Sequence, residues 1–164
     1  MRHKILVLLA LCVSQFCNGQ VTQLHYSGNN KKIAFAVEAA NKILRDPSFY
    51  NRIDTIARFD NSEYSGHRIV NEFQKLGRVI EVTDYWRPIA WANAKTVTKI
   101  KINSAKLRRS HSSITNTLIH ETVHAVDWIT NGEWNYTHSG NSPEGQSATA
   151  PWIIGSIAES MVNK

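Results

Sequence analysis

Residues 113–130 combine the apolar spacing of a buried helix with two histidines placed four residues apart, His120 and His124. Apolar side chains such as Leu118 and Val126 recur at helical spacing, so neighbouring elements must pack against this segment. Side chains four residues apart leave the same face of a helix. The chain is therefore expected to fold around this helix and to hold two imidazoles side by side on one of its faces.

The chemistry of this face follows from the sequence His120-Glu121-Thr122-Val123-His124, an H-E-x-x-H motif. Two imidazoles so placed can bind one metal ion, and Glu121, one residue further round the helix, lies beside that ion rather than on it. Zinc lowers the pKa of a water molecule, and a neighbouring carboxylate can accept the proton. We therefore predict zinc as the cofactor, His120 and His124 as its ligands, and Glu121 as the general base.

The segment Thr117-Leu118-Ile119-His120-Glu121-Thr122-Val123-His124-Ala125-Val126-Asp127 resembles the active-site helix of the zincin metallopeptidases. A strand predicted at residues 96–103 resembles the strand that borders the substrate cleft in that superfamily. The resemblance is specific for residues 117–127 and only architectural over the rest of the C-terminal half. It implies a zincin-like α+β fold and hydrolysis of an amide bond.

A catalytic zinc site takes a third protein ligand and keeps one position open. We predict His138 as this ligand, because it lies in a polar loop after His124 that can fold back over the helix. Glu159, on a later helix, is the alternative ligand. Its position on a helical wheel, pointing away from Ile157, indicates a solvated side chain. Asp127 is predicted as a partner that orients a ligand histidine, or as a helix-end cap.

Hydrolysis of an amide also needs a group that stabilises the negative oxygen of the tetrahedral intermediate. Tyr136, His111 and His67 carry suitable donors. We predict Tyr136, because it lies in the same loop as His138.

The N-terminus has the layout of a secretory signal peptide. Arg2 and Lys4 precede an apolar run that is too short for a permanent membrane anchor. We predict cleavage after Gly19, which makes residues 1–19 the signal peptide and residues 20–164 a single domain. Cleavage as a lipoprotein at Cys17 is the weaker alternative. The protein is thus expected to be secreted or periplasmic.

Both cysteines, Cys12 and Cys17, lie in this signal segment. The mature chain therefore has neither disulfides nor thiolate ligands, and its metal site must use His, Asp or Glu. About 145 residues can supply a core without disulfides. Removing Arg2 and Lys4 lowers the formal charge from +6 to +4. The remaining basic residues are scattered, so nucleic-acid binding is not expected.

The elements expected along the chain define an α+β domain with N-terminal helices and a small twisted sheet. Asp46-Pro47 is expected to start a helix, Gly77 to end one, and Ser112 or Ser113 to cap the metal-bearing helix. The five tryptophans are expected mainly in or near the core. The predicted helices are 29–45, 47–56, 65–75, 113–130 and one starting at Pro151; the strands are 79–83 and 96–103; residues 132–149 form an ordered loop.

These observations predict a monomeric, exported zinc hydrolase that cleaves proteins, peptides or peptidoglycan cross-links. Three other classes stay open. The chain can be a binding module that keeps a zincin-like fold without turnover. It can be a structural zinc protein with four ligands, or a cationic protein that binds acidic surfaces.

Overall fold

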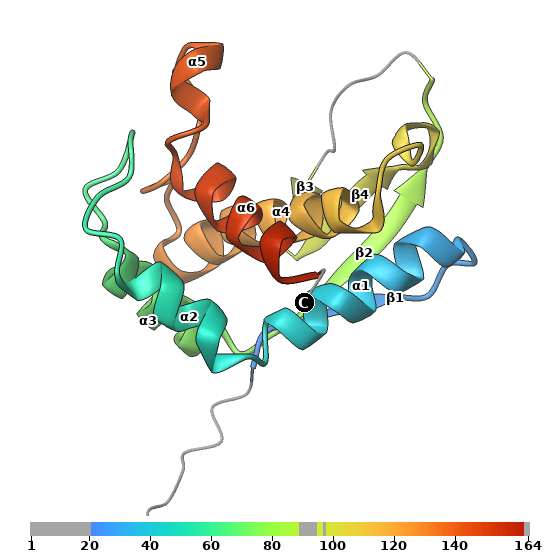
Figure 1. Ribbon diagram of the computed structural model, residues 1–164, viewed down its shortest axis with the longest axis horizontal. Coiled ribbons are helices and arrows are strands. Elements are labelled where there is room, and N and C mark those ends of the chain that lie inside the picture. The colour runs from blue at the N-terminus through green and yellow to red at the C-terminus, as the bar shows by residue number, and fades with distance from the viewer. Residues whose placement is uncertain (1–20, 89–94, 97, 163–164) are drawn as a thin grey trace, which may run out of the picture.

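The computed structural model describes residues 21–88, 95–96 and 98–162. The predicted signal peptide, with Cys12 and Cys17, lies outside the described residues, and so does position 97 within the strand predicted at 96–103. The described chain is a mixture of helices and one small sheet, as an α+β fold requires (Figure 1).

The sheet has the strand order β1-β2-β4-β3. Three of its strands are parallel: β1 (Gln23–Tyr26), β2 (Val79–Tyr85) and β4 (Lys99–Asn103). The short edge strand β3 (Lys95–Thr96) is antiparallel to β4. Apolar side chains alternate along the strands and are buried on one face, so the helices cover the sheet from that side. These buried residues are Leu24, Ile80, Val82, Ile100 and Ile102.

The strand predicted at 79–83 is present as β2, but the prediction of a single strand at 96–103 is wrong. The chain reverses direction between Thr96 and Lys99, and the two arms pair with each other. The sequence carries a sign of this reversal. Along one continuous strand, side chains an even number of residues apart share a face, so Val97 and Ile100, three residues apart, would face opposite sides of the sheet. Strand β1 was not predicted. It has only four residues, and the Asn41 side chain supports it by bonding both the N–H and the carbonyl of Leu24 at 2.8 and 2.9 Å.

The N-terminal helices begin and end close to the predicted positions. They are α1 (Lys31–Ile43), α2 (Pro47–Asp54) and α3 (Gly66–Leu76). The predicted cap of α2 is confirmed: the Asp46 carboxylate accepts from the N–H of Ser48, and Pro47 starts the helix. Helix α3 ends at Gly77, as predicted, in a left-handed conformation with φ of 49°.

Helix α4 (His111–Asn131), on which the metal site was predicted, is longer than predicted. Its N-cap is Ser110 rather than Ser112 or Ser113, because the Ser110 hydroxyl accepts from the N–H of Ser113 at 3.1 Å. Gly132, with φ of 67°, ends it. The segment that follows contains a short helix, α5 (Pro143–Gln146), where only a loop was predicted. The last helix, α6 (Ala150–Val162), begins one residue before Pro151.

Helix α4 lies in the middle of the molecule and contacts α1, α3 and α6 (Figure 1). Most of its residues from Leu118 to Asp127 are buried. A helix held on several sides keeps its ligand side chains in place, and this is what positions the site. Within the described segments, we find no helix that combines the length and the apolarity needed to cross a bilayer.

Candidate metal centre

Three histidines meet beside α4. His120 and His124 come from the helix, and His138 comes from the segment between Gly132 and α5. One ring nitrogen of each lies within 4.8 Å of those of the other two. The ring centroids are 5.0 to 5.2 Å apart. The structure thus brings together the three residues predicted as metal ligands.

The surroundings of this cluster suit a bound cation that keeps contact with solvent. His120 is 8% exposed and His124 2%, while His138 is half-buried. Neutral imidazoles are ligands for zinc and for other transition metals such as copper, iron and nickel. Among the described residues the group contains these three side chains, which leaves coordination positions for water or substrate.

Glu121 lies next to His120 on α4 and is half-buried. Both line a cavity of about 540 Å³ that runs between α4 and α6. A second cavity of about 450 Å³ is lined by Trp134, whose ring lies 5.7 Å from that of His124. The first cavity thus reaches the cluster directly through His120, and the second is separated from His124 by the Trp134 ring.

Two tryptophans flank the cluster, where the sequence analysis expected mainly core positions. Trp152 is 40% exposed and stands edge-on to His120, with ring centroids 5.0 Å apart. Trp134 is 45% exposed and packs against Trp128 as well as His124. Half-exposed aromatic rings beside the histidines offer apolar surface to a ligand.

Helix α4 anchors the segment that carries His138 through Asp127. This buried carboxylate accepts from the backbone N–H of Asn135, at 2.9 and 3.1 Å to its two oxygens, and from that of Tyr136 at 2.9 Å. Burial raises the pKa of Asp127 to about 6, although the two N–H donors act in the opposite direction. Asp127 was predicted to orient a ligand histidine or to cap the helix. Its described contacts are instead with loop backbone, so it orients the peptide segment leading to His138.

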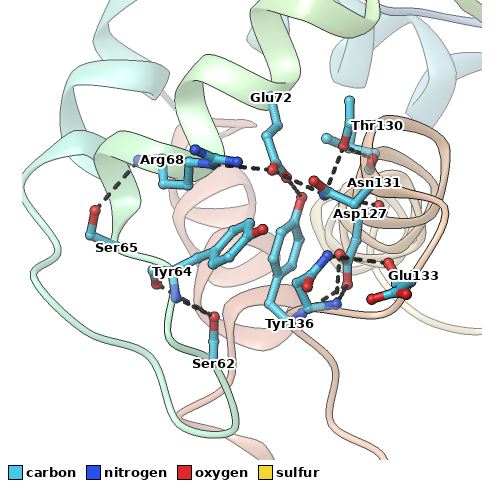
Figure 2. A network of polar contacts seen from close by, with 12 residues as sticks. Ser62, Tyr64, Ser65, Arg68, Glu72, Asp127, Thr130, Asn131, Glu133 and Tyr136 are labelled. Carbon is cyan, nitrogen blue, oxygen red and sulfur yellow. Dashed lines mark hydrogen bonds and ion pairs between the residues drawn. The ribbon is translucent and has the colours of Figure 1, made fainter.

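The structure does not place Tyr136 where the predicted role, stabilising the oxyanion, requires it. Its side chain is fully buried, and its hydroxyl donates to the Glu72 carboxylate at 2.8 Å, as Figure 2 shows. Burial and the charge of Glu72 raise the pKa of Tyr136 well above its usual range. The ring that was expected to face the substrate therefore points into the core, toward α3.

Glu72 is a structural residue that the sequence analysis missed. It is 2% exposed, accepts from Asn131 at 3.0 Å and lies 3.5 Å from the Arg68 guanidinium (Figure 2). The sequence indicates that Glu72 is buried, because its spacing places it on the same face of the helix as the apolar residues Ile69 and Leu76. An acid within an apolar stripe must find buried partners.

A second contact holds the same segment from outside. Asn61, with φ of 56°, donates from its amide to the carbonyls of Thr137 and Ser139 at 2.7 and 3.2 Å. Ser62 forms an antiparallel bridge with Tyr136. Contacts on two sides thus fix the backbone immediately before and after His138.

The other candidate residues lie apart from the cluster. The carboxylate of Glu159, the alternative ligand, accepts from the Asn116 amide at 2.7 Å and lines the larger cavity. His67 is exposed and bonds Asp54 at 2.8 Å. His111 packs on Phe35 at the start of α4, with ring centroids 4.4 Å apart.

Comparison with known protein families, with curated proteins and with solved structures gives no match for this chain.

Proposed function

We propose that this protein is a zinc-dependent hydrolase, a metallopeptidase of the H-E-x-x-H type. One observation carries the proposal: His138, from a separate segment, meets the histidine pair of α4, and His120 of that pair lines a cavity together with Glu121. The motif alone supplies two ligands and a base, and the folded chain supplies a third imidazole next to them. The resemblance of residues 117–127 to the zincin active-site helix favours the same class.

Each group would have a distinct task. His120, His124 and His138 would hold the ion, which when bound would acidify a water molecule and polarise the substrate carbonyl. Glu121 accepts the proton of the attacking water and returns it to the leaving nitrogen. Trp152, 40% exposed on the wall of the same cavity, offers an apolar ring surface to the substrate beside the reacting groups. The substrates we expect are proteins, peptides or peptidoglycan cross-links.

The test joins metal content with turnover. We expect the purified protein, residues 20–164, to bind one zinc ion and to hydrolyse members of a proteome-derived peptide library. Glu121→Gln should retain zinc and lose about a hundredfold or more in turnover, because a general base contributes at least that much. Glu38→Gln, at an exposed glutamate on α1, is the matched control and should keep full activity.

Two outcomes would contradict the proposal. A protein that neither contains nor takes up zinc has no such centre. A zinc-loaded protein in which wild type and Glu121→Gln are equally inactive is the binding module on a zincin-like fold. Export is tested separately, since a secreted or periplasmic product should begin at Gln20.

A further inference from the structure

The cavity beside His120 and Glu121 extends away from the metal centre along the first half of α4. Its walls come from α4, from α6 and from the residue that precedes the cap of α4. Ser113 and His120 line the same cavity and lie seven residues apart, which corresponds to about 10 Å along the helix axis. The cavity is also lined by Arg109, Asn116, Thr117, Glu121, Trp152 and Glu159.

Arg109 holds its guanidinium against Thr117, which lies about one helical turn before His120. Its Nη1 donates to the Thr117 hydroxyl at 2.7 Å, and that hydroxyl donates in turn to the carbonyl of Ser113 at 3.2 Å. Thr117 precedes His120 by three residues, so its side chain stands next to that of His120 on the helix surface. The guanidinium is thereby held at a defined place in the cavity wall.

Arg109 is half-buried, and one of its side-chain donors is left without a partner among the described residues. Its Nε is buried and makes no hydrogen bond within the described part of the chain. Burial lowers the pKa of Arg109, while the charge of Glu159 acts in the opposite direction. A partly desolvated guanidinium with an unused Nε donor gains most from an anion that accepts two N–H bonds at once, as a carboxylate does.

Glu159 faces the same cavity and limits what can enter. Asn116 holds its carboxylate, and Gly155 leaves the room that this requires, because a Cβ on Gly155 would lie 2.5 Å from the Asn116 side-chain oxygen. The wall holds one guanidinium, from Arg109, and two carboxylates, from Glu121 and Glu159, which favours a ligand with a single negative charge placed at Arg109. A second negative charge would meet Glu159.

We propose that Arg109 is a substrate-binding residue that anchors a carboxylate of the substrate close to the scissile bond. One turn of helix spans about 5 Å and an extended peptide about 3.3 Å per residue, so the carboxylate belongs to a residue within about two positions of that bond. The inference rests on the proposed function, because it places the carboxylate relative to the bond that Glu121 helps to break.

The first measurement is binding, and it does not depend on turnover. N-acetyl-L-alanine and its uncharged amide are titrated into the zinc-loaded protein while the side-chain N–H signals of Arg109 and Trp152 are followed by NMR. We expect the acid to shift both signals and the amide to leave them unchanged. The acid should not shift the Trp152 signal in Arg109→Met. Arg108→Met, at the exposed neighbouring arginine, is the matched control and should behave as wild type.

The second measurement is selectivity. Peptides that the wild type cleaves in the library should be enriched in Asp, Glu or a free C-terminus within two residues of the cut. For the best of them, Arg109→Met should lower kcat/KM roughly tenfold to a hundredfold, mainly through KM, and Arg109→Lys should lower it less. The same peptide with Gln for Glu, or with an amidated end, should show little dependence on Arg109. These two replacements tell a side-chain carboxylate from a terminal one.

The outcomes separate the two proposals. If neither acid nor amide shifts the two signals, Arg109 is not a carboxylate anchor, whatever the enzyme cleaves. An equal loss of kcat for acidic and neutral peptides in Arg109→Met would assign Arg109 to the transition state and overturn the inference. An absence of zinc-dependent cleavage would overturn the proposed function, and the titration would still decide whether Arg109 binds a carboxylate. Circular dichroism of Arg109→Lys shows whether the site stays folded.

Discussion

His138 differs from the other two histidines in what holds it. His120 and His124 share one helix, so backbone hydrogen bonds fix their spacing, whereas His138 depends on a segment folded back over α4. We expect His138→Ala to weaken zinc binding by more than the roughly tenfold to hundredfold that follows loss of an outer partner. Competition with a chromophoric chelator measures this. His25→Ala, at an exposed position on β1, is the control, and Glu159→Ala should retain zinc; the reverse pattern would assign Glu159 as the ligand.

The position of Tyr136 near His138 in the sequence suggested a role at the reacting groups, whereas its burial gives it a structural role in the core. Tyr136→Phe removes the hydroxyl that donates to Glu72 and leaves a buried carboxylate with fewer donors. We expect the free energy of unfolding to fall by about 1–3 kcal/mol, while the peptide hydrolysis proposed for the zinc-loaded protein is unchanged. Urea denaturation and turnover are measured on the same preparation. A large loss of turnover at unchanged stability would restore the oxyanion role.

At the scale of elements, Asp127 links α4 to the segment that carries His138. Asp127→Asn keeps the shape of the side chain but loses the charge and one of the two acceptor oxygens that the N–H groups of Asn135 and Tyr136 use. We expect zinc affinity to fall by about tenfold, because the third ligand is held less firmly. Asp54→Asn, on the exposed end of α2, is the matched control. Unchanged affinity in Asp127→Asn would mean that the contacts of Asn61 suffice.

The raised pKa of Asp127 predicts that the stability of the protein depends on pH. The pKa of Asp127 is raised from 3.8 to about 6, so the folded state holds this proton more tightly than the unfolded chain. The free energy of unfolding that this group contributes must therefore fall as the pH rises from 3.8 to about 6 and stay constant above. Urea denaturation of the metal-free protein across this range should show the fall in wild type and not in Asp127→Asn. If the free energy of unfolding changes with pH in the same way in both proteins, the pKa of Asp127 is not raised in the folded state.

At the scale of the whole molecule, a metal ion on these three histidines would tie together parts of the chain that are separate in sequence. It would join α4 to the segment after Gly132, which the loop around Asn61 also contacts. Binding to the folded state alone stabilises it, so removal of zinc by a chelator should lower the melting temperature by roughly 10 °C. Calorimetry with and without chelator measures this. The shift should be absent in His138→Ala, and a shift that persists there would place the metal elsewhere.

The elements that could be predicted are those whose signals are local. The cap at Asp46, the stop at Gly77 and the helical spacing around His120 each depend on a few neighbouring residues. Strand β1 and the reversal between β3 and β4 escaped prediction. A four-residue strand is stabilised by its partners, and the reversal shows in the sequence only as one break in the alternation, between Val97 and Ile100.

The sequence by itself determined the core of the candidate site: two imidazoles on one face of a helix, with a carboxylate beside them. It did so because the backbone hydrogen bonds of a helix set the positions of residues one turn apart. Only the tertiary structure decided that His138 lies beside these two imidazoles. It also decided that Tyr136 donates a hydrogen bond to Glu72 in the core, and that Arg109 lies in the cavity wall beside Thr117. These contacts join residues far apart in the chain or in different elements, and packing, not spacing, sets their distances.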